Sequence, residues 1–170
     1  MKIEIVEYGG TPQEDDGIAT LLSLVYVQGG FTEESTAKNL FAPTEVTRRG
    51  NVILAKTSDG KLVGMIICAP PGNPYRQIAT SDEAEMHLLA VAPGARGKGL
   101  GRALCLAFED EAEALGYGKL VLSTQPAMHA AHRLYESLGY RRNPARDWSR
   151  ADKRYFAYEK SLAPRESGLG

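Results

Sequence analysis

The sequence predicts a single mixed α/β domain built on a mixed sheet. Three observations support this fold class. Apolar residues alternate at the two-residue period of a strand in several short runs and follow the helical period in others. Two strand-like runs flank Ser58-Asp59-Gly60, which is a hairpin signal. After that hairpin, strand and helix patterns alternate without the regular repeat of a doubly wound sheet.

The first half of the chain contains one isolated strand, two helices and the hairpin. Thr11 and Pro12 start a helix because acidic residues follow in the first turn, where the helix dipole favours them. The expected elements are a strand over Met1–Glu7, a helix from Thr11-Pro12 to Gly29-Gly30, a shorter helix over Thr32–Asn39, strands over Asn51–Thr57 and Lys61–Ala69, and a loop over Pro70–Asp82.

The second half alternates strands with two helices. Each helix has a one-sided apolar face and ends at a glycine, Gly116 for the first and Gly139 for the second. We expect one domain over residues 1–162 and a short flexible tail over residues 163–170. The expected elements are strand Glu83–Val91, a helix from Leu100, strand Lys119–Ser123, helix Met128–Leu138, an extra strand near Tyr140–Arg142 and a final strand Arg154–Leu162.

Composition narrows the classes of function. The chain of 170 residues has a net charge of -1, so no global field attracts nucleic acid or an anionic membrane. No apolar run approaches the ~20 residues of a membrane span, and the N-terminus lacks a signal-peptide core. Cys68 and Cys105 lie in apolar surroundings and are expected to be buried, reduced thiols. We therefore predict a cytoplasmic protein with no nucleic-acid or membrane partner.

Within the segment LLAVAPGARGKGLGRAL, Leu88–Leu104, the stretch Arg96–Arg102 places three glycines and three cations between a strand and a helix. Backbone amides at a helix N-terminus bind anions, and glycine allows a phosphate to approach closely. A phosphate-bearing ligand is one interpretation; a tight turn with a solvated basic rim is the other. A Walker loop is excluded because Gly99, not Ser or Thr, follows Lys98. A G-x-G-x-x-G dinucleotide loop also fails, because neither glycine pair has a third glycine at the required spacing.

The pattern that fits is Arg-x-x-Gly-x-Gly over Arg96–Gly101, and it resembles the GNAT superfamily of acyl-CoA-dependent N-acyltransferases. EMHLLAV, Glu85–Val91, resembles the fourth strand of that family. AAHRLYESLGYRR, Ala130–Arg142, resembles the helix that follows its fifth strand and the start of the next strand. The resemblance is close over Glu83–Arg142, and two separate motifs are more specific than either one alone.

The resemblance implies the family's sheet, which is mostly antiparallel and splayed between strands 4 and 5, and acetyl-CoA as co-substrate. In that family the loop amides hold the pyrophosphate of coenzyme A, and the pantetheine arm lies along the fourth strand as an added strand would. The cofactor-binding residues that it implies are Leu89, Ala90 and Val91 for the arm, and Arg96, Gly97, Lys98, Gly99, Leu100, Gly101 and Arg102 for the phosphates.

Two residues are candidates for catalysis. Acetyl transfer to an amine needs a base for the amine and a proton for the departing thiolate. Tyr135 stands where the family often has the tyrosine that protonates the sulfur; alternatively it is a core aromatic. Glu85 stands where some members have a general base; alternatively it is a solvated strand-end glutamate, since a base needs a raised pKa.

The sequence departs from the family pattern at two positions. Ser123 stands where some members carry a catalytic acid on the fifth strand, and Met128 stands where an asparagine often contacts the pantetheine. Ser123 and Thr124 are the polar residues that we expect to replace that contact.

The histidines have open roles. His87 shares a strand face with Glu85 and is either a second base or a satisfied core histidine. His129 and His132 are three residues apart on a helix, but no Cys or acid cluster stands nearby to complete a metal site. We expect surface histidines and no metal.

The late basic residues Arg141, Arg142, Arg146 and Arg150 are expected to form a solvated face. Trp148, within Arg146–Trp148, lies where the family builds its acceptor wall. It is either an acceptor contact or a plug in the core of a small domain.

The expected activity is transfer of an acetyl group from acetyl-CoA to a primary amine by direct attack in a ternary complex. The acceptor is a small-molecule amine or a peptide, and acids at Glu33, Glu34 and Asp82–Glu85 favour a cationic one. Two alternatives stay open: a CoA-binding regulatory or sensor module with little turnover, and an acyltransferase for longer acyl groups. Members of the family commonly dimerise, so a homodimer also stays open.

Overall fold

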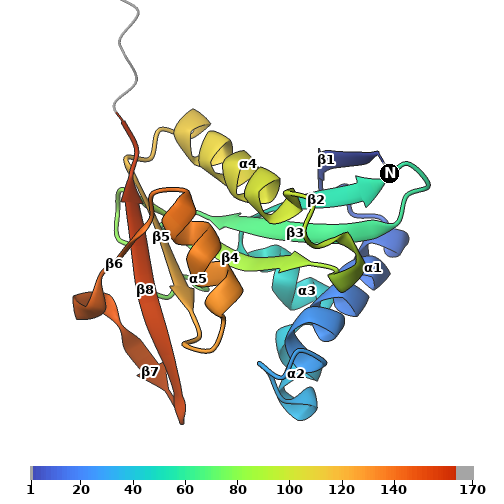
Figure 1. Ribbon diagram of the computed structural model, residues 1–170, viewed down its shortest axis with the longest axis horizontal. Coiled ribbons are helices and arrows are strands. Elements are labelled where there is room, and N and C mark those ends of the chain that lie inside the picture. The colour runs from blue at the N-terminus through green and yellow to red at the C-terminus, as the bar shows by residue number, and fades with distance from the viewer. Residues whose placement is uncertain (1, 164–170) are drawn as a thin grey trace, which may run out of the picture.

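The computed structural model describes residues 2–163, which form a mixed sheet with helices on both faces (Figure 1). The sheet order is β1-β2-β3-β4-β5-β8-β6, and β7 pairs with β8 off this path. Neighbouring strands are antiparallel except β4 and β5, which are parallel. The predicted mixed, mostly antiparallel sheet is therefore confirmed. The strands are β1 Ile3–Glu7, β2 Asn51–Thr57, β3 Leu62–Ala69, β4 Glu83–Val91, β5 Lys119–Thr124, β6 Arg141–Arg142, β7 Trp148–Arg150 and β8 Lys153–Ser161.

The helices begin where the sequence provides start signals. In α1 the Thr11 hydroxyl accepts a hydrogen bond from the Glu14 amide, and the Glu14 carboxylate accepts one from the Thr11 amide, both at 3.2 Å. A π-helical turn, Ser23–Val27, continues α1 toward the predicted stop at Gly29-Gly30. The helices are α1 Pro12–Leu22, α2 Glu34–Leu40, α3 Pro43–Val46, α4 Leu100–Ala114 and α5 His129–Ser137.

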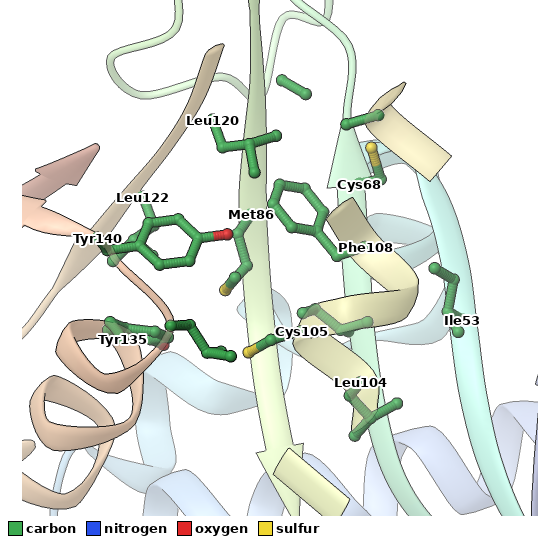
Figure 2. Close-up of a cluster of buried hydrophobic side chains, with 14 of the residues drawn as sticks. Ile53, Cys68, Met86, Leu104, Cys105, Phe108, Leu120, Leu122, Tyr135 and Tyr140 are labelled. Carbon is green, nitrogen blue, oxygen red and sulfur yellow. The ribbon is translucent and has the colours of Figure 1, made fainter. Parts of the chain in front are cut away.

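Two apolar cores lie on opposite faces of the sheet. On one face, α4 and α5 pack through residues such as Leu104, Phe108 and Tyr135 (Figure 2). On the other face, α1, α2 and α3 cover the sheet through residues such as Leu22 and Val46. Cys68 and Cys105 are buried free thiols in the first core, as predicted, and burial raises the pKa of each to about 12.

The structure adds two short elements that the sequence analysis did not predict. Helix α3 is a single turn begun by Pro43, and β7 is a three-residue strand that forms a hairpin with β8. Both are too short for a periodic pattern. The segment Pro70–Asp82 contains no helix or strand, as predicted. Apart from Ala163, the predicted tail lies outside the described residues. Within residues 2–163, no helix has the length and apolarity that a membrane crossing requires.

Strands β4 and β5 pair only at their N-terminal ends. Their register joins Glu83–Met86 to Lys119–Leu122, and no pairing between the two continues past Met86. A β-bulge explains the change: between the pairs Met65–Ala90 and Ile67–His87, β4 holds one residue more than β3. Leu88, in the bulge, has φ 49°, a backbone conformation that is costly for a branched side chain. The C-terminal half of the β4 edge that faces β5 therefore has no strand partner.

Candidate active site

The turn that leads into α4 presents a row of unpaired backbone amides. Within the part of the chain that the structure describes, none of the amides from Gly97 to Arg102 donates a hydrogen bond; the first that does is the Ala103 amide, to the Gly99 carbonyl at 3.0 Å. These amides precede and begin a 15-residue helix, whose dipole adds positive potential. The turn is therefore built to bind an anion through its backbone.

The three glycines of this turn serve two purposes. Gly97 and Gly99 both have φ 77°, which only glycine adopts without strain. Gly101 has ordinary helical geometry, but a Cβ on it would lie 3.2 Å from Cδ2 of Leu134, so it allows α4 to approach α5. Two glycines thus shape the turn and the third sets the packing of the two helices.

The cations of the turn are free to meet a ligand. Arg96, Lys98 and Arg102 are all exposed, and Leu100 between them is buried. Arg96 donates from Nε to the Val91 carbonyl at 3.2 Å, which ties the turn to the end of β4. The basic rim therefore stands at the open edge of β4.

The three predicted pantetheine contacts on β4 do not face the same way. The Ala92 amide donates to the Val63 carbonyl at 2.8 Å, and backbone groups alternate in direction along a strand. Val91 therefore points its amide and carbonyl to the open side, whereas Ala90 points its own toward β3. The carbonyl of Leu89 already accepts a hydrogen bond from the Tyr26 hydroxyl at 2.9 Å. Of the three residues predicted to offer backbone groups, Ala90 is thus the one placed wrongly for the role.

Tyr135 lies in the core between α4, α5 and the sheet, close to Cys105 and Met86 (Figure 2). Its residue exposure is 6%, and its ring packs edge-on against Tyr140 with centroids 5.9 Å apart. Burial raises the pKa of Tyr135 well above its ordinary value, and interaction with Tyr26 adds to the shift. Within residues 2–163 its hydroxyl has no hydrogen-bond partner. Tyr135 is therefore both a core aromatic and a protonated donor without an acceptor.

Glu85 is neither a solvated strand-end glutamate nor a base with a raised pKa, the two roles that the sequence left open. Its side chain is fully buried, and its carboxylate accepts hydrogen bonds from the amides of the loop residues 77, 78 and 79 at 2.7, 2.7 and 3.2 Å. Burial alone would raise the pKa of Glu85, but the hydrogen bond from His87 and the loop amides outweigh it and lower this pKa. The expected raised pKa and access to substrate are both absent. The structure instead makes Glu85 the anchor of the Pro70–Asp82 loop.

His87 is a buried histidine that is satisfied at one of its two ring nitrogens only. It is buried, and its Nε2 shares a hydrogen bond with the Glu85 carboxylate. Its Nδ1 is enclosed and has no partner among the described residues. With Glu85 ionised, Nε2 is the nitrogen that donates to the carboxylate, and in the neutral imidazole Nδ1 is then an acceptor. The His87 ring is thus fixed by one hydrogen bond, and its other nitrogen has no partner among the described residues.

Comparison with known proteins places this geometry in a family. The model of the Acetyltransferase (GNAT) family matches residues 18–140. The chain belongs to the GNAT acetyltransferase family. A mycothiol acetyltransferase of Renibacterium salmoninarum is 41% identical over 58 residues, which are 34% of this chain and 17% of that protein. The chain therefore spans less than a fifth of the length of this curated relative.

Solved structures share the GNAT fold. An acetyltransferase from Streptococcus agalactiae superposes with a TM-score of 0.75 at 22% identity, covering 94% of this chain and 98% of that one. A PaiA N-acetyltransferase from Thermoplasma acidophilum, solved in complex with coenzyme A, gives a TM-score of 0.72 at 18% identity, covering 95% and 100%. Family and fold together support acyl transfer.

The departures from the GNAT pattern on β5 are filled by internal contacts. The Ser123 hydroxyl accepts a hydrogen bond from Nε1 of Trp148 at 2.8 Å, and the Thr124 hydroxyl contacts the sulfur of Met128 at 3.7 Å. The Ser123 hydroxyl keeps its own O–H donor, whereas the Thr124 hydroxyl is directed at that sulfur. Trp148 also stacks on Tyr155 with centroids 4.2 Å apart, so it joins the β7–β8 hairpin to β5 and is not a core plug.

The basic run late in this GNAT chain is not one solvated face. Arg146 binds the Glu83 carboxylate with two hydrogen bonds of 2.7 Å and the Ile78 carbonyl with a third, also 2.7 Å. Arg142 binds Asp147 through two hydrogen bonds of 2.7 and 2.9 Å. Only Arg141 and Arg150 of the four are exposed. Because Glu83 and Glu85 are both occupied, these acids are also not available to attract a cationic amine.

His129 is exposed, as expected, whereas His132 is partly buried and hydrogen-bonds the Gln125 carbonyl at 3.0 Å. Two residues near the open edge of β4 were missed altogether. Tyr26 lies in the π-helical turn and binds Leu89, and Arg49 lies in the 3-10 turn Thr47–Arg49 with 8% exposure. No local motif marks either one, because each reaches the site only through the packing of α1 and α3 on the sheet.

Proposed function

We propose that this protein transfers an acetyl group from acetyl-CoA to the primary amine of a small molecule or peptide, by direct attack in a ternary complex. The observation that carries the proposal is the row of unpaired amides from Gly97 to Arg102 at the end of the open edge of β4. Such a row suits a diphosphate, and an open strand edge suits an extended arm with amide groups. Acyl transfer itself agrees with the family.

Tyr135 is the proposed acid. In the reaction, the amine nitrogen bonds to the acetyl carbon, the carbon–sulfur bond breaks, and the thiolate takes a proton. Tyr135 holds a proton because burial raises its pKa, and its hydroxyl is not committed to another residue among those described. A positioned acid of this kind contributes about 10²- to 10⁴-fold to the rate.

His87 is the proposed acceptor of the amine proton, in place of Glu85. Its Nδ1 is without a partner among the described residues, and Glu85 orients the ring through Nε2. The proposed role of Glu85 is thereby to position His87. We expect His87→Gln to lower kcat because it removes the proton acceptor, and Glu85→Gln to lower kcat because it weakens the contact that orients the ring.

The test measures thiol release from acetyl-CoA in the presence of a panel of amines, with calorimetric titration of CoA in parallel. Thiol release that depends on both the amine and Tyr135 supports the proposal. The rival is a CoA-binding sensor module, favoured by the sequestered carboxylate of Glu85. Tight CoA binding without thiol release for any amine would establish the sensor instead.

A further inference from the structure

We propose that the acceptor is an amine that also carries a carboxylate, and that Arg49 binds this carboxylate. The inference rests on the proposed acetyl transfer and adds the chemical class of the acceptor. It starts from a feature that the donor site does not use, a buried guanidinium without a counter-ion.

Arg49 is an unpaired buried cation. Its residue exposure is 8%, and its Nε is enclosed without a hydrogen-bond partner. Among residues 2–163, no carboxylate or carbonyl accepts a hydrogen bond from its side chain. Burying an arginine without a partner costs several kcal/mol, so such a site is retained when a ligand supplies the missing charge.

A carboxylate near Arg49 is already engaged by other residues. Burial lowers the pKa of Arg49, whereas the negative charge of Glu45 raises it. The Glu45 carboxylate, however, already accepts a hydrogen bond from the Tyr75 hydroxyl at 2.8 Å and lies 3.8 Å from Arg48. The positive charge of Arg150, on β7, lowers the pKa of Arg49. The charge of Arg150 therefore adds to that of Arg49 and does not offset it.

Arginines elsewhere in the chain show what a purely structural role looks like. Arg146 is bound by Glu83 and by the Ile78 carbonyl, and Arg142 is bound by Asp147. Each has at least one bidentate or backbone contact, as is usual for a buried guanidinium. Arg49 is more buried than either and has none. This contrast supports the proposal that Arg49 binds a ligand.

The place of Arg49 connects it to the reaction. Tyr26 interacts electrostatically with Arg49 and with Tyr135, and its hydroxyl binds the Leu89 carbonyl at the bulge of β4. Tyr26 therefore connects Arg49 to the strand along which the thioester is proposed to sit. The planar fork of a guanidinium matches a carboxylate, and an amino acid carries a carboxylate and an amine a few bonds apart.

The test compares matched acceptors. Glycine, L-alanine, L-aspartate and β-alanine are each assayed against their carboxamides, and O-phosphoethanolamine is included as an amine with a different anion. We expect kcat/KM to be at least about 10-fold higher for the best acid than for its amide, since a hydrogen bond to a charged group is worth about one to two factors of ten. In Arg49→Gln this preference disappears, while KM for acetyl-CoA and the rates with carboxamides change less than about twofold.

Two measurements protect the test against loss of folding. In the ligand-free protein, Arg49→Met should melt at the same or a higher temperature, because it removes an uncompensated charge. Arg146→Met, which breaks a satisfied contact, should melt lower. The exposed Arg150→Gln should raise KM for the acid about two- to fivefold without a change in melting temperature.

The outcomes separate the two proposals. Equal use of acids and amides, or preference for O-phosphoethanolamine, overturns the carboxylate site and leaves acetyl transfer intact. Calorimetric binding of the acid that needs Arg49, without thiol release, supports the site and rejects turnover. Absence of any preference in either assay, or a lower melting temperature for Arg49→Met, assigns Arg49 to the structure and overturns the inference.

Discussion

The donor side and the proposed acceptor side of this molecule are built in opposite ways. The donor side is contiguous: six residues, 97–102, present backbone amides whose direction is set by glycine geometry. The acceptor side gathers side chains from four separate elements, namely Tyr26, Arg49, His87 and Arg150. A backbone site depends on local conformation, whereas a dispersed site depends on the whole fold. Substitutions within the turn therefore test the donor side, whereas substitutions of single side chains test the acceptor side.

The largest expected effect is at Tyr135, which lies between the two sides. Tyr135→Phe should lower kcat by about 10²- to 10³-fold with little change in KM for acetyl-CoA, because it removes one proton and little volume. Tyr140→Phe is the matched control, since Tyr140 lies in the same core but donates to Glu109 at 3.4 Å. Steady-state kinetics of both variants checks this. An equal loss in the two variants would assign Tyr135 to packing alone.

The next effect concerns stability in acid. The hydrogen bond from Arg146 outweighs burial and lowers the pKa of Glu83 from 4.5 to about 2. A lowered pKa means that the stabilisation is complete above pH 4.5 and is lost as the pH falls toward 2. Glu83→Gln should therefore lower the free energy of unfolding at pH 7 by about 2 to 3 kcal/mol and flatten its decline over this range.

Urea unfolding at several pH values measures the contribution of Glu83. The neighbouring Asp82→Asn is the control, because Asp82 is exposed and has no ion pair among the described residues. If Glu83→Gln retains the full acid dependence of the natural protein, the Arg146 contact does not stabilise the fold as we describe it.

The third prediction isolates the glycine geometry of the donor turn. Gly99→Ala should cost about 1 kcal/mol in backbone strain and raise KM for acetyl-CoA roughly 10-fold, because the amides would turn away from the phosphates. Gly116, at the other end of α4, has a similar positive φ of 85°, so Gly116→Ala should cost similar stability without affecting KM. Parallel changes in KM for both variants would show that general strain, not the amide row, sets affinity.

The smallest effect is expected at the basic rim. Lys98→Gln should raise KM for acetyl-CoA about two- to threefold in low salt, and the difference should fade at high ionic strength, because exposed charges are screened. Lys38→Gln, an exposed lysine on α2, should have no such effect. A salt-independent loss at Lys98 would indicate a specific contact rather than a general field.

The contrast between the sides also explains what the sequence could predict. Gly97–Arg102 follow one another, so their spacing alone predicts an anion-binding turn, and the motif around Tyr135 adds the family. Glu85 was misjudged because the loop amides that bury it are seven or so residues upstream and have no signature. Arg146 and Arg150 look alike in the sequence, and only the sheet pairing decides which of them meets Glu83. Arg49 could not be identified from the sequence, because its lack of a hydrogen-bond partner among the described residues is seen only in the folded structure.

The anchoring of the Pro70–Asp82 loop has a consequence for how the protein exchanges its substrates. The amides of residues 77–79 donate hydrogen bonds to Glu85, and Arg146 donates one to the Ile78 carbonyl. Residues 77–79 are therefore expected to move together with β4. We therefore expect no closing lid here, and a turnover rate that is insensitive to solvent viscosity. Relatives with other acceptors would differ by exchange of individual side chains around a fixed frame. Selectivity for the acceptor would then depend on which side chains surround it and not on movement of the loop.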